Sequence, residues 1–194
     1  MIQINNPDPS RICQGDIFEE VPFFETFSIK ERIITFQIID FPYVLVMTQD
    51  CDLLSDYRLI EKKDNVLDQK ILSTLVVPLY NAEHLWKGEH VSDLNYNANI
   101  IGSKDKDKIK KNLIPRYHFI QFPPKAKLAN MVIDFKHYFS ITSSFLKDNL
   151  DKRVCSIAGL FREDISHRFS FYLSRIGLPE ISDDKKVKDI VEGS

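Results

Sequence analysis

The sequence predicts an α+β fold, with a small curved β-sheet or an SH3-like β-barrel followed by C-terminal helices. Short runs rich in β-branched and aromatic residues recur through residues 1–140, with little helical spacing between the early ones. After residue 140 the apolar residues take the spacing of a helix. With 194 residues, of which 43% are hydrophobic, the chain can bury a sizeable core and suits one domain better than two.

The first strands are expected in the first quarter of the chain. A Gly-Asp turn signal at residues 15–16 precedes residues 17–24, which supply the apolar positions of a strand. Residues 32–39 alternate and are rich in isoleucine, which predicts a second strand. The Asp-Phe-Pro at 40–42 is expected to break it, and residues 43–47 are apolar throughout, as in a strand buried on both faces. Further strands are expected at residues 57–61, 71–79, 117–122 and 131–135.

Residues 102–112 are charged and nearly without apolar side chains, so we expect an exposed, mobile loop within the β-rich core. The segment lacks aromatic residues on which bases stack, which favours a simple solvated loop. Its lysines are nevertheless the candidates for contacting a phosphate backbone: Lys104, Lys106, Lys108, Lys110 and Lys111.

Residues 141–179 are expected to form a helical extension packed on that core. The Thr-Ser-Ser at 142–144 can cap a short helix. A longer helix follows, and Gly177 and Pro179 supply its stop. Its apolar stripe consists of Phe161, Ile165, Phe169, Tyr172, Leu173 and Ile176. The tail, residues 180–194, is polar and expected to fray.

The polar residues of this last helix fall into two groups. Arg168 and Arg175 flank the apolar stripe, where their stems can cover apolar surface or the pair can bind an anion. The residues opposite the stripe are expected in solvent, without a pocket for catalysis: Glu163, His167, Ser170 and Ser174.

Composition excludes several classes of protein. A net charge of -2 lacks the bulk basicity of a backbone-binding protein, so any nucleic-acid site is a local patch. The three cysteines are odd in number and lack a CxxC pair, which argues against a disulfide framework and favours the reducing cytoplasm. The N-terminal residues do not resemble a secretion signal, and the apolar stretch at 33–47 is interrupted and shorter than the ~20 residues of a membrane helix.

Asp50, Cys51 and Asp52 follow the doubly buried strand, where functional groups often lie. A nucleophilic cysteine is disfavoured because two carboxylates oppose thiolate formation. A hard-metal site is the second possibility, but two carboxylates without a third ligand specify little. The favoured interpretation is structural: Cys51 is buried and unreactive, and the aspartates bond loop amides.

The five histidines show no HxH or HExxH spacing, so the sequence predicts neither a metal site nor a cofactor. They are His84, His90, His118, His137 and His167. Of these, His118 and His137 can approach Asp134 only through tertiary contacts.

Two short motifs resemble the PemK/MazF toxin family over about the first eighty residues. Residues 14–18, Gln-Gly-Asp-Ile-Phe, are similar to the family's Gly-Asp-Ile/Val strand start, and residues 42–48, Pro-Tyr-Val-Leu-Val-Met-Thr, to its Pro-x-hydrophobic strand. Residues 71–79 resemble the next long strand. The resemblance implies an SH3-like barrel, frequent dimerisation and, in active members, cleavage of single-stranded RNA.

The chain departs from this family at two places. The arginine that usually precedes the proline is Phe41 here, so the cation expected to stabilise a cleavage transition state has no match. Thr48 stands near the family's hydroxyl position, but without the arginine the resemblance does not carry a catalytic role over to it. From about Tyr117 onward the chain extends beyond a minimal toxin.

Two functional hypotheses follow. In the first, the protein is a binding or regulatory module of a bacterial toxin-antitoxin or defence system. Its ligand is then a protein partner, which can be encoded by a neighbouring gene, or RNA. The protein can also form a homodimer under this hypothesis. In the second, it is a metal-independent endoribonuclease in which Lys30 or Arg32 replaces the missing arginine.

Overall fold

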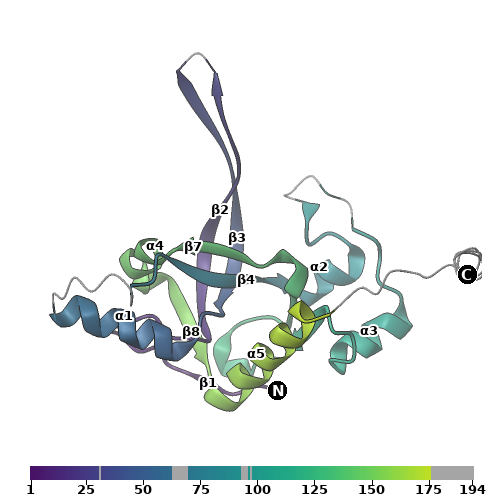
Figure 1. The fold of residues 1–194 in the computed structure, drawn as a ribbon. Helices are drawn as coiled ribbons and strands as arrows, with labels where there is room; N and C mark the ends of the chain where they lie inside the picture. Colours follow the sequence, from purple (N-terminus) through teal and green to yellow (C-terminus); the bar gives the residue numbers. More distant parts are fainter. Residues whose placement is uncertain (31, 63–69, 93–95, 97, 176–194) are drawn as a thin grey trace, which may run out of the picture.

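The computed structural model describes residues 1–30, 32–62, 70–92, 96 and 98–175. Within them the chain forms a curled antiparallel sheet with the strand order β1-β8-β2-β3-β4-β6-β5, and β7 pairs with β4. Helices lie around this sheet (Figure 1). The predicted α+β fold, with a small curved sheet and helices, is confirmed.

The strands are β1 (Ile4–Asn5), β2 (Asp16–Lys30), β3 (Ile33–Val46), β4 (Ser73–Asn81), β5 (Tyr117–Ile120), β6 (Met131–Asp134), β7 (Phe139–Thr142) and β8 (Arg153–Ile157). The α-helices are α1 (Asp50–Lys62), α2 (Ala82–Lys87), α3 (Ser103–Lys110), α4 (Ser143–Asp148) and α5 (Gly159–Leu173). Three single-turn helices complete the described elements: η3 (Pro124–Ala126), η4 (Phe135–His137) and η5 (Leu150–Lys152).

The sheet separates two hydrophobic cores. Because successive side chains of a strand point to opposite faces, Val44 and Val46 of β3 enter the first core, while Leu45 and Met47 enter the second. The expectation that residues 43–47 are buried from both sides is therefore confirmed for the last four of them.

The helices follow the same division of the sheet. Leu85 of α2 and Leu146 of α4 are buried in the first core. Ile165 and Phe169 of α5 are buried in the second, so α5 confirms the predicted amphipathic helix. Its predicted stop at Gly177 and Pro179, and the tail 180–194, lie outside the described residues.

The β2–β3 hairpin extends well beyond the rest of the sheet (Figure 1). β8 pairs with β2 only at residues 16–18, and β4 pairs with β3 only at residues 44–46. We call the outer part of this hairpin, residues 24–30 and 32–38, the arm.

Two expectations about local structure are wrong in the first third of the chain. β3 runs without a break through residues 40–42, because at Pro42 the strand has β2 on one side only and needs no amide donor toward β4. Residues 57–61 belong to helix α1 rather than to a strand. Asp50 and Asp52 in the first turn favour this helix through its dipole, and Leu53 anchors it in the first core.

Further corrections concern the later segments. Residues 103–110 form helix α3 rather than a loop, because one apolar residue, Ile109, suffices to bury its inner side. The 141–179 segment is not purely helical, since β8 lies in the sheet between β1 and β2. β7 was also not expected from the sequence.

Candidate functional site

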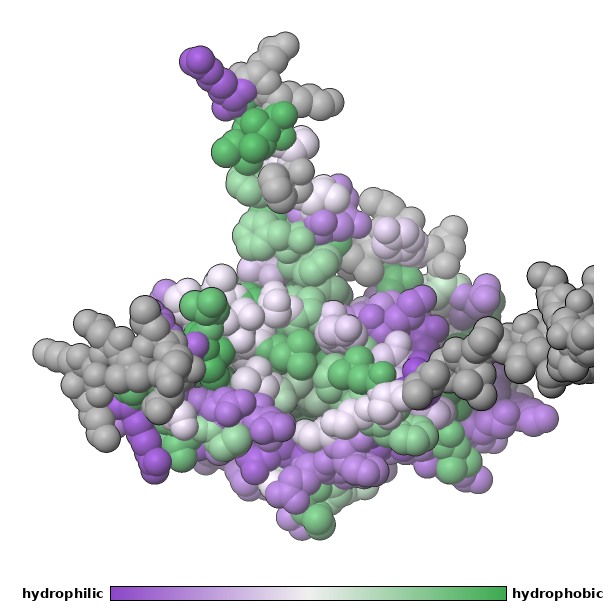
Figure 2. Space-filling view, in the orientation of Figure 1, coloured by the Kyte–Doolittle hydropathy of each residue, from purple (hydrophilic) through white to green (hydrophobic). Residues whose placement is uncertain are grey.

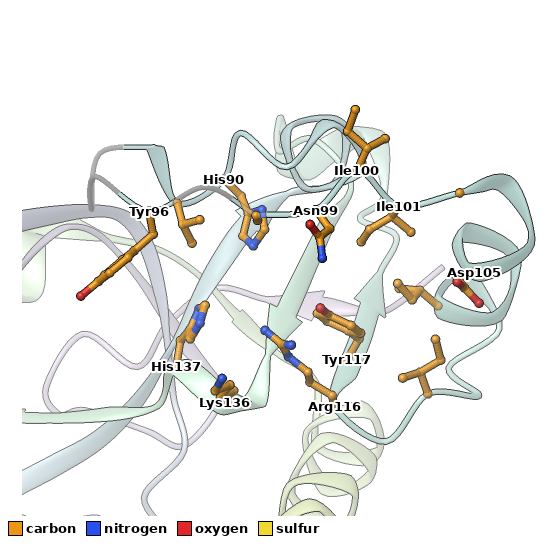
Figure 3. Close-up of a pocket in the computed structure, with 15 residues that line it drawn as sticks. His90, Tyr96, Asn99, Ile100, Ile101, Asp105, Arg116, Tyr117, Lys136 and His137 are labelled. Carbon is orange, nitrogen blue, oxygen red and sulfur yellow. The ribbon is translucent and has the colours of Figure 1, made fainter.

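A cleft of about 700 Å³ opens beside the first core, between the segment that follows α2 and the strand pair β5–β6. Figure 3 shows His90 and Asn99 on one wall pointing toward His137 and Arg116 on the other. Lys136, Tyr96 and Tyr117 also line it. We call this hollow the cleft.

The wall that carries His90 is fixed by a sharp helix end. α2 stops at Gly88, whose φ of 77° is left-handed, and a Cβ there would collide with the carbonyl of Ala98. The backbone N–H of Ile101 donates to the carbonyl of Trp86 at 3.0 Å. These contacts hold the segment after α2 against the helix and set His90 over the cleft.

The opposite wall is organised by Asp134, whose side chain is fully buried at the end of β6. Arg116 donates to both of its carboxylate oxygens, with Nε 2.8 Å from Oδ1, and the Lys136 N–H donates to Oδ1 at 3.0 Å. The guanidinium also lies over the ring of Tyr117. Asp134 thereby fixes the guanidinium at the cleft wall, and its hydrogen bond raises the pKa of Arg116.

His137 lies on the same wall and is oriented by Tyr80. The Tyr80 hydroxyl is 2.9 Å from Nδ1 of His137, and Oδ2 of Asp134 is 3.8 Å from the same nitrogen. Burial lowers the pKa of His137, against the opposing effect of the nearby Asp134 carboxylate. At neutral pH the imidazole is therefore mainly uncharged.

His90 completes the arrangement from the other wall. Its ring meets the Tyr80 ring edge-on, with the centroids 4.9 Å apart. Its Nδ1 is buried and has no hydrogen-bond partner among the described residues. Burial lowers the pKa of His90 to about 4, so this imidazole is neutral at pH 7 and can accept a proton from a bound group.

The cleft therefore combines cations with neutral proton acceptors. Lys136 and Arg116 carry positive charge, although Arg116 is paired with Asp134 and the carboxylate of Asp105 also lines the cleft. The two imidazoles and Asn99 supply hydrogen-bonding groups. Among the described residues no group of three or more His, Cys, Asp or Glu side chains is placed to hold a metal ion. The arrangement suits an anionic ligand that also gains or loses protons.

The strand-end residues singled out from the sequence have a different environment. Asp50 opens α1 and accepts two hydrogen bonds from Arg11, at 3.0 and 3.1 Å, and one from the Gln14 N–H at 3.2 Å. Burial opposes ionisation, but these bonds outweigh it and lower the pKa of Asp50. Asp50 therefore bonds a loop amide, as the structural interpretation expected.

Cys51 corrects that interpretation, because its side chain is exposed on α1 instead of buried. The segment turns into a helix at Asp50, and this turn directs Cys51 and Asp52 into solvent. Cys155 is buried and Cys13 is intermediate. Among the three thiols, Cys51 is the one that an alkylating reagent reaches most readily.

A buried pair lies close to Asp50 along the same surface. Arg153, with 4% of its side chain exposed, contacts the fully buried Asp16 at 3.3 Å and donates to the Arg11 carbonyl at 2.7 Å. We call Arg11, Gln14, Asp16, Asp50 and Arg153 the strand-end cluster. Its charges bind groups of the fold itself.

The catalytic candidates from the sequence lie apart from the cleft. The Thr48 hydroxyl accepts a hydrogen bond from the Leu75 N–H at 2.7 Å and ties β3 to β4. Lys30 pairs with Ile33 at the arm's tip, and Arg32 is in the turn. About 26 Å of strand separates this tip from Phe41, at ~3.3 Å per residue. The tip therefore does not replace the missing arginine within one molecule.

The predicted lysines all belong to α3 and the residue after it, which border the cleft through Asp105 and Ile109. Lys106 lies over the Trp86 ring at 6.0 Å, and Lys108 is 3.4 Å from Asp105. None of the five predicted lysines is among the residues that line the cleft. They are Lys104, Lys106, Lys108, Lys110 and Lys111.

Arg168 and Arg175 do not form an anion site. Arg168 donates to the carbonyls of Ile114 and Tyr117, at 3.2 and 2.9 Å, and so fastens α5 to the start of β5. Arg175 stacks on Tyr172 at 4.3 Å. Both arginines therefore serve packing, as the alternative interpretation held.

Of the sequence candidates, Asp134 and His137 do meet, whereas His118 does not join them. Tyr117 pairs with Asp134 across β5 and β6, so the next residue, His118, points to the opposite face of the sheet. There burial lowers its pKa to about 4.

Sequence reasoning missed the roles of His90, Tyr80, Arg116 and Lys136. A signal was present for the last two. When two neighbouring strands pair as an antiparallel hairpin, the start of one meets the end of the other. Arg116 directly precedes one predicted strand, and Lys136 directly follows the other.

No protein-family model and no curated protein matches this chain. Within the part of the chain that the structure describes, no helix is long and apolar enough to cross a membrane.

Proposed function

We propose that this protein binds single-stranded RNA in the cleft and acts as a PemK/MazF-like binding or regulatory module in a bacterial toxin-antitoxin or defence system. The observation that carries the proposal is the convergence of Arg116, Lys136, His90 and His137 on one cleft. A phosphodiester is an anion whose oxygens accept hydrogen bonds from each of these groups. Binding therefore needs only this local patch in a chain whose net charge is -2.

The shape of the surroundings favours a polymer over a single nucleotide. A second hollow of about 490 Å³ shares His90 with the cleft, and a third of about 320 Å³ shares Lys136 and His137. Tyr80 lines both of these further hollows. Consecutive nucleotides can occupy consecutive hollows, and exposed Tyr96 offers a ring on which a base can stack.

The proposed setting comes from the resemblance in residues 14–18 and 42–48. Phe41, which stands where the family has its arginine, lines the second hollow together with His90. Its ring lies 6.3 Å from that of Tyr80. RNA bound at the cleft would thus pass the position of the missing arginine. A co-encoded protein partner that covers the cleft is part of this proposal.

A binding experiment with a charge-matched control tests the RNA proposal. Fluorescence anisotropy of a labelled pool of single-stranded RNA is measured with wild-type protein, Lys136→Glu and Lys125→Glu. Both variants change the net charge equally, but Lys125 is an exposed residue of η3 that does not line the cleft. We expect Lys136→Glu to weaken binding about tenfold or more and Lys125→Glu less than about twofold. Absence of binding by the wild type, or equal losses in both variants, would refute the proposal.

A second candidate function, a metal-independent endoribonuclease, is favoured specifically by the histidine pair. A neutral imidazole, His90, would take the proton of a ribose 2′-hydroxyl as that oxygen attacks the adjacent phosphorus. His137 would give its proton to the departing 5′-oxygen from the minor fraction that is protonated at neutral pH, a form that the nearby Asp134 carboxylate stabilises. The products would be a 2′,3′-cyclic phosphate and a free 5′-hydroxyl. Arg116 and Lys136 would stabilise the charge on the phosphoryl oxygens.

Incubation of the RNA pool with protein in EDTA separates this candidate from simple binding. If the protein is a nuclease, His90→Gln and His137→Gln each lower the cleavage rate by about 10²-fold or more. The variant with Lys30 and Arg32 both replaced by alanine should keep full activity. Binding without cleavage would support the binding function and exclude the nuclease. Cleavage that survives both histidine substitutions would show that the catalytic groups lie outside the cleft.

A further inference from the structure

The arm presents a free two-stranded ribbon. Its register runs from the pair Phe24–Ile38 to the pair Lys30–Ile33, and neither strand has a third strand beside it there among the described residues. An isolated pair of strands is marginally stable in water, and three strands or a packed face are needed for independent stability. The length of the arm therefore calls for a surface that covers it.

One face of this ribbon is apolar along its whole length. The cross-strand pairs Phe24–Ile38 and Ile29–Ile34 lie on it, with Phe36 between them. The rings of Phe24 and Phe36 meet edge-on, 6.1 Å apart. Figure 2 shows hydrophobic residues following the arm from the body of the molecule toward its tip.

The other face is polar apart from the exposed Ile33 near the tip. Thr26 pairs with Gln37 and Ser28 with Thr35, and the hydroxyls of Ser28 and Thr35 are 2.6 Å apart. A bulge at Glu25 shifts the pairing register between Phe24 and Thr26. Because of this shift, Phe24 lies on the apolar face and Thr26 on the polar face. The arm is thus amphipathic although no other part of the described chain packs on its apolar face.

The exposed apolar area is large for a monomer. Of the sixteen large hydrophobic side chains that are exposed among the described residues, six lie on the arm. Five of them form the apolar face, and they are 49% to 64% exposed: Phe24, Ile29, Ile34, Phe36 and Ile38. A fully exposed side chain of these types offers roughly 150–200 Å² of surface, so the five together expose about 500 Å². The largest apolar patch on a typical monomer covers about 300–600 Å², and the arm is near the top of that range.

We propose that this face binds the same face of a second copy of the chain. The described side chains of the face carry no charge, so its best cover is another flat apolar ribbon, and each copy supplies one. Two such faces bury about 1,000 Å² together, the lower limit for a specific interface. They pack as two layers ~10 Å apart, related by a two-fold axis. This dimer does not depend on RNA binding in the cleft.

The test is the molar mass in solution of the wild type and its variants by light scattering after size exclusion, from about 1 to 100 µM. Phe36→Lys places a charge on the apolar face, and Thr35→Lys places the same charge on the polar face one residue away. We expect a concentration-dependent dimer for the wild type and for Thr35→Lys, and a monomer for Phe36→Lys. The double variant Ile34→Thr and Phe36→Thr, which keeps β-branched residues in the strand, should also be monomeric.

A wild type that stays monomeric throughout this range would overturn the proposal. So would a dimer that survives both apolar-face variants, or one that Thr35→Lys abolishes equally. Circular dichroism and a thermal melt confirm that each variant retains the folded body. Binding of RNA by the monomeric variants, measured in parallel, keeps a failure here separate from a failure of the proposed function.

Discussion

The strand-end cluster and the cleft both pair an arginine with a buried aspartate, but they differ in the charged groups around that pair. At the strand end Asp16 accepts from Arg153, and Asp50 accepts from Arg11 and a backbone amide, so the charges are used within the fold. In the cleft Arg116 is likewise paired with the buried Asp134, but the exposed Lys136 on the same wall makes no salt bridge among the described residues. An unpartnered buried atom does not distinguish the two regions, since Oδ1 of Asp16 and Nδ1 of His90 both lack a hydrogen-bond partner among the described residues. The comparison teaches that a site for a ligand is recognised by exposed charges that the fold leaves unpaired.

The largest effect is expected when the strand-end cluster loses Arg153. Arg153→Met leaves the carboxylate of Asp16 buried without its cation, which should lower the free energy of unfolding by about 3–5 kcal/mol. Urea denaturation measures this loss. Arg58→Met, at an exposed position of α1, is the control and should change stability by less than about 0.5 kcal/mol. RNA binding by folded Arg153→Met should equal that of the wild type, and a selective loss of binding would contradict the division between the two clusters.

A smaller effect, with a defined pH dependence, is expected at Asp50. Asp50→Asn weakens the pairing with Arg11 and should cost about 1–3 kcal/mol at pH 7. The pKa of Asp50 is lower in the folded chain than its ordinary 3.8. Its ionised form therefore stabilises the protein above about pH 4, and this contribution disappears as the pH falls through the folded pKa.

Urea titrations of the wild type and Asp50→Asn at several pH values check this prediction. The stability difference between the two proteins should be constant near neutral pH and shrink below pH ~4. A difference that grows on acidification would mean that Asp50 is not held as a paired carboxylate.

The smallest effect is expected from the lysines of α3 and its C-terminal end, which lie outside the cleft. Replacing Lys104, Lys108, Lys110 and Lys111 by glutamine should reduce the salt dependence of binding to a long single-stranded RNA, by ~0.7 in slope for each phosphate that a lysine no longer neutralises. Binding of a dinucleotide, which the cleft alone can hold, should not change. Replacement of Lys87 and Lys125 provides the control. Weaker dinucleotide binding would show that α3, rather than the cleft, holds the phosphate.

The sequence predicted the long strands better than the helices because strands leave a strong pattern of residue types. Residues 33–39 alternate although six of the seven are exposed on the arm, and the apolar run that ends β3 is buried between two cores, so both were recognisable. In α3 a single buried isoleucine, Ile109, holds a helix that is otherwise charged, and composition alone cannot detect one anchor. At α1 the acidic residues that begin a helix, Asp50 and Asp52, are also residue types that favour a turn.

The cleft was harder to predict because its residues come from four separate segments. Asp134 and His137 are near each other in sequence and were considered together. His90 reaches Tyr80 through the turn at Gly88, whose left-handed backbone is not readable from the residue type alone. Asp50, Cys51 and Asp52 are contiguous and therefore conspicuous in the sequence, but the side chains of Cys51 and Asp52 face solvent.

The most direct test of the account is a nuclear magnetic resonance titration of the five imidazoles with single-stranded RNA. The pKa of His90 is about 4 in the free protein because of burial, and a bound phosphate should raise it by stabilising the charged ring. We therefore expect His90 and His137 to shift and to gain protons on binding at pH ~6. His118, buried on the other face of the sheet, and the exposed His167 should not respond. His84 lines the second hollow, so it responds only when the RNA extends beyond the cleft. Binding that leaves His90 and His137 unchanged, or that shifts His167 instead, would contradict the placement of RNA in the cleft.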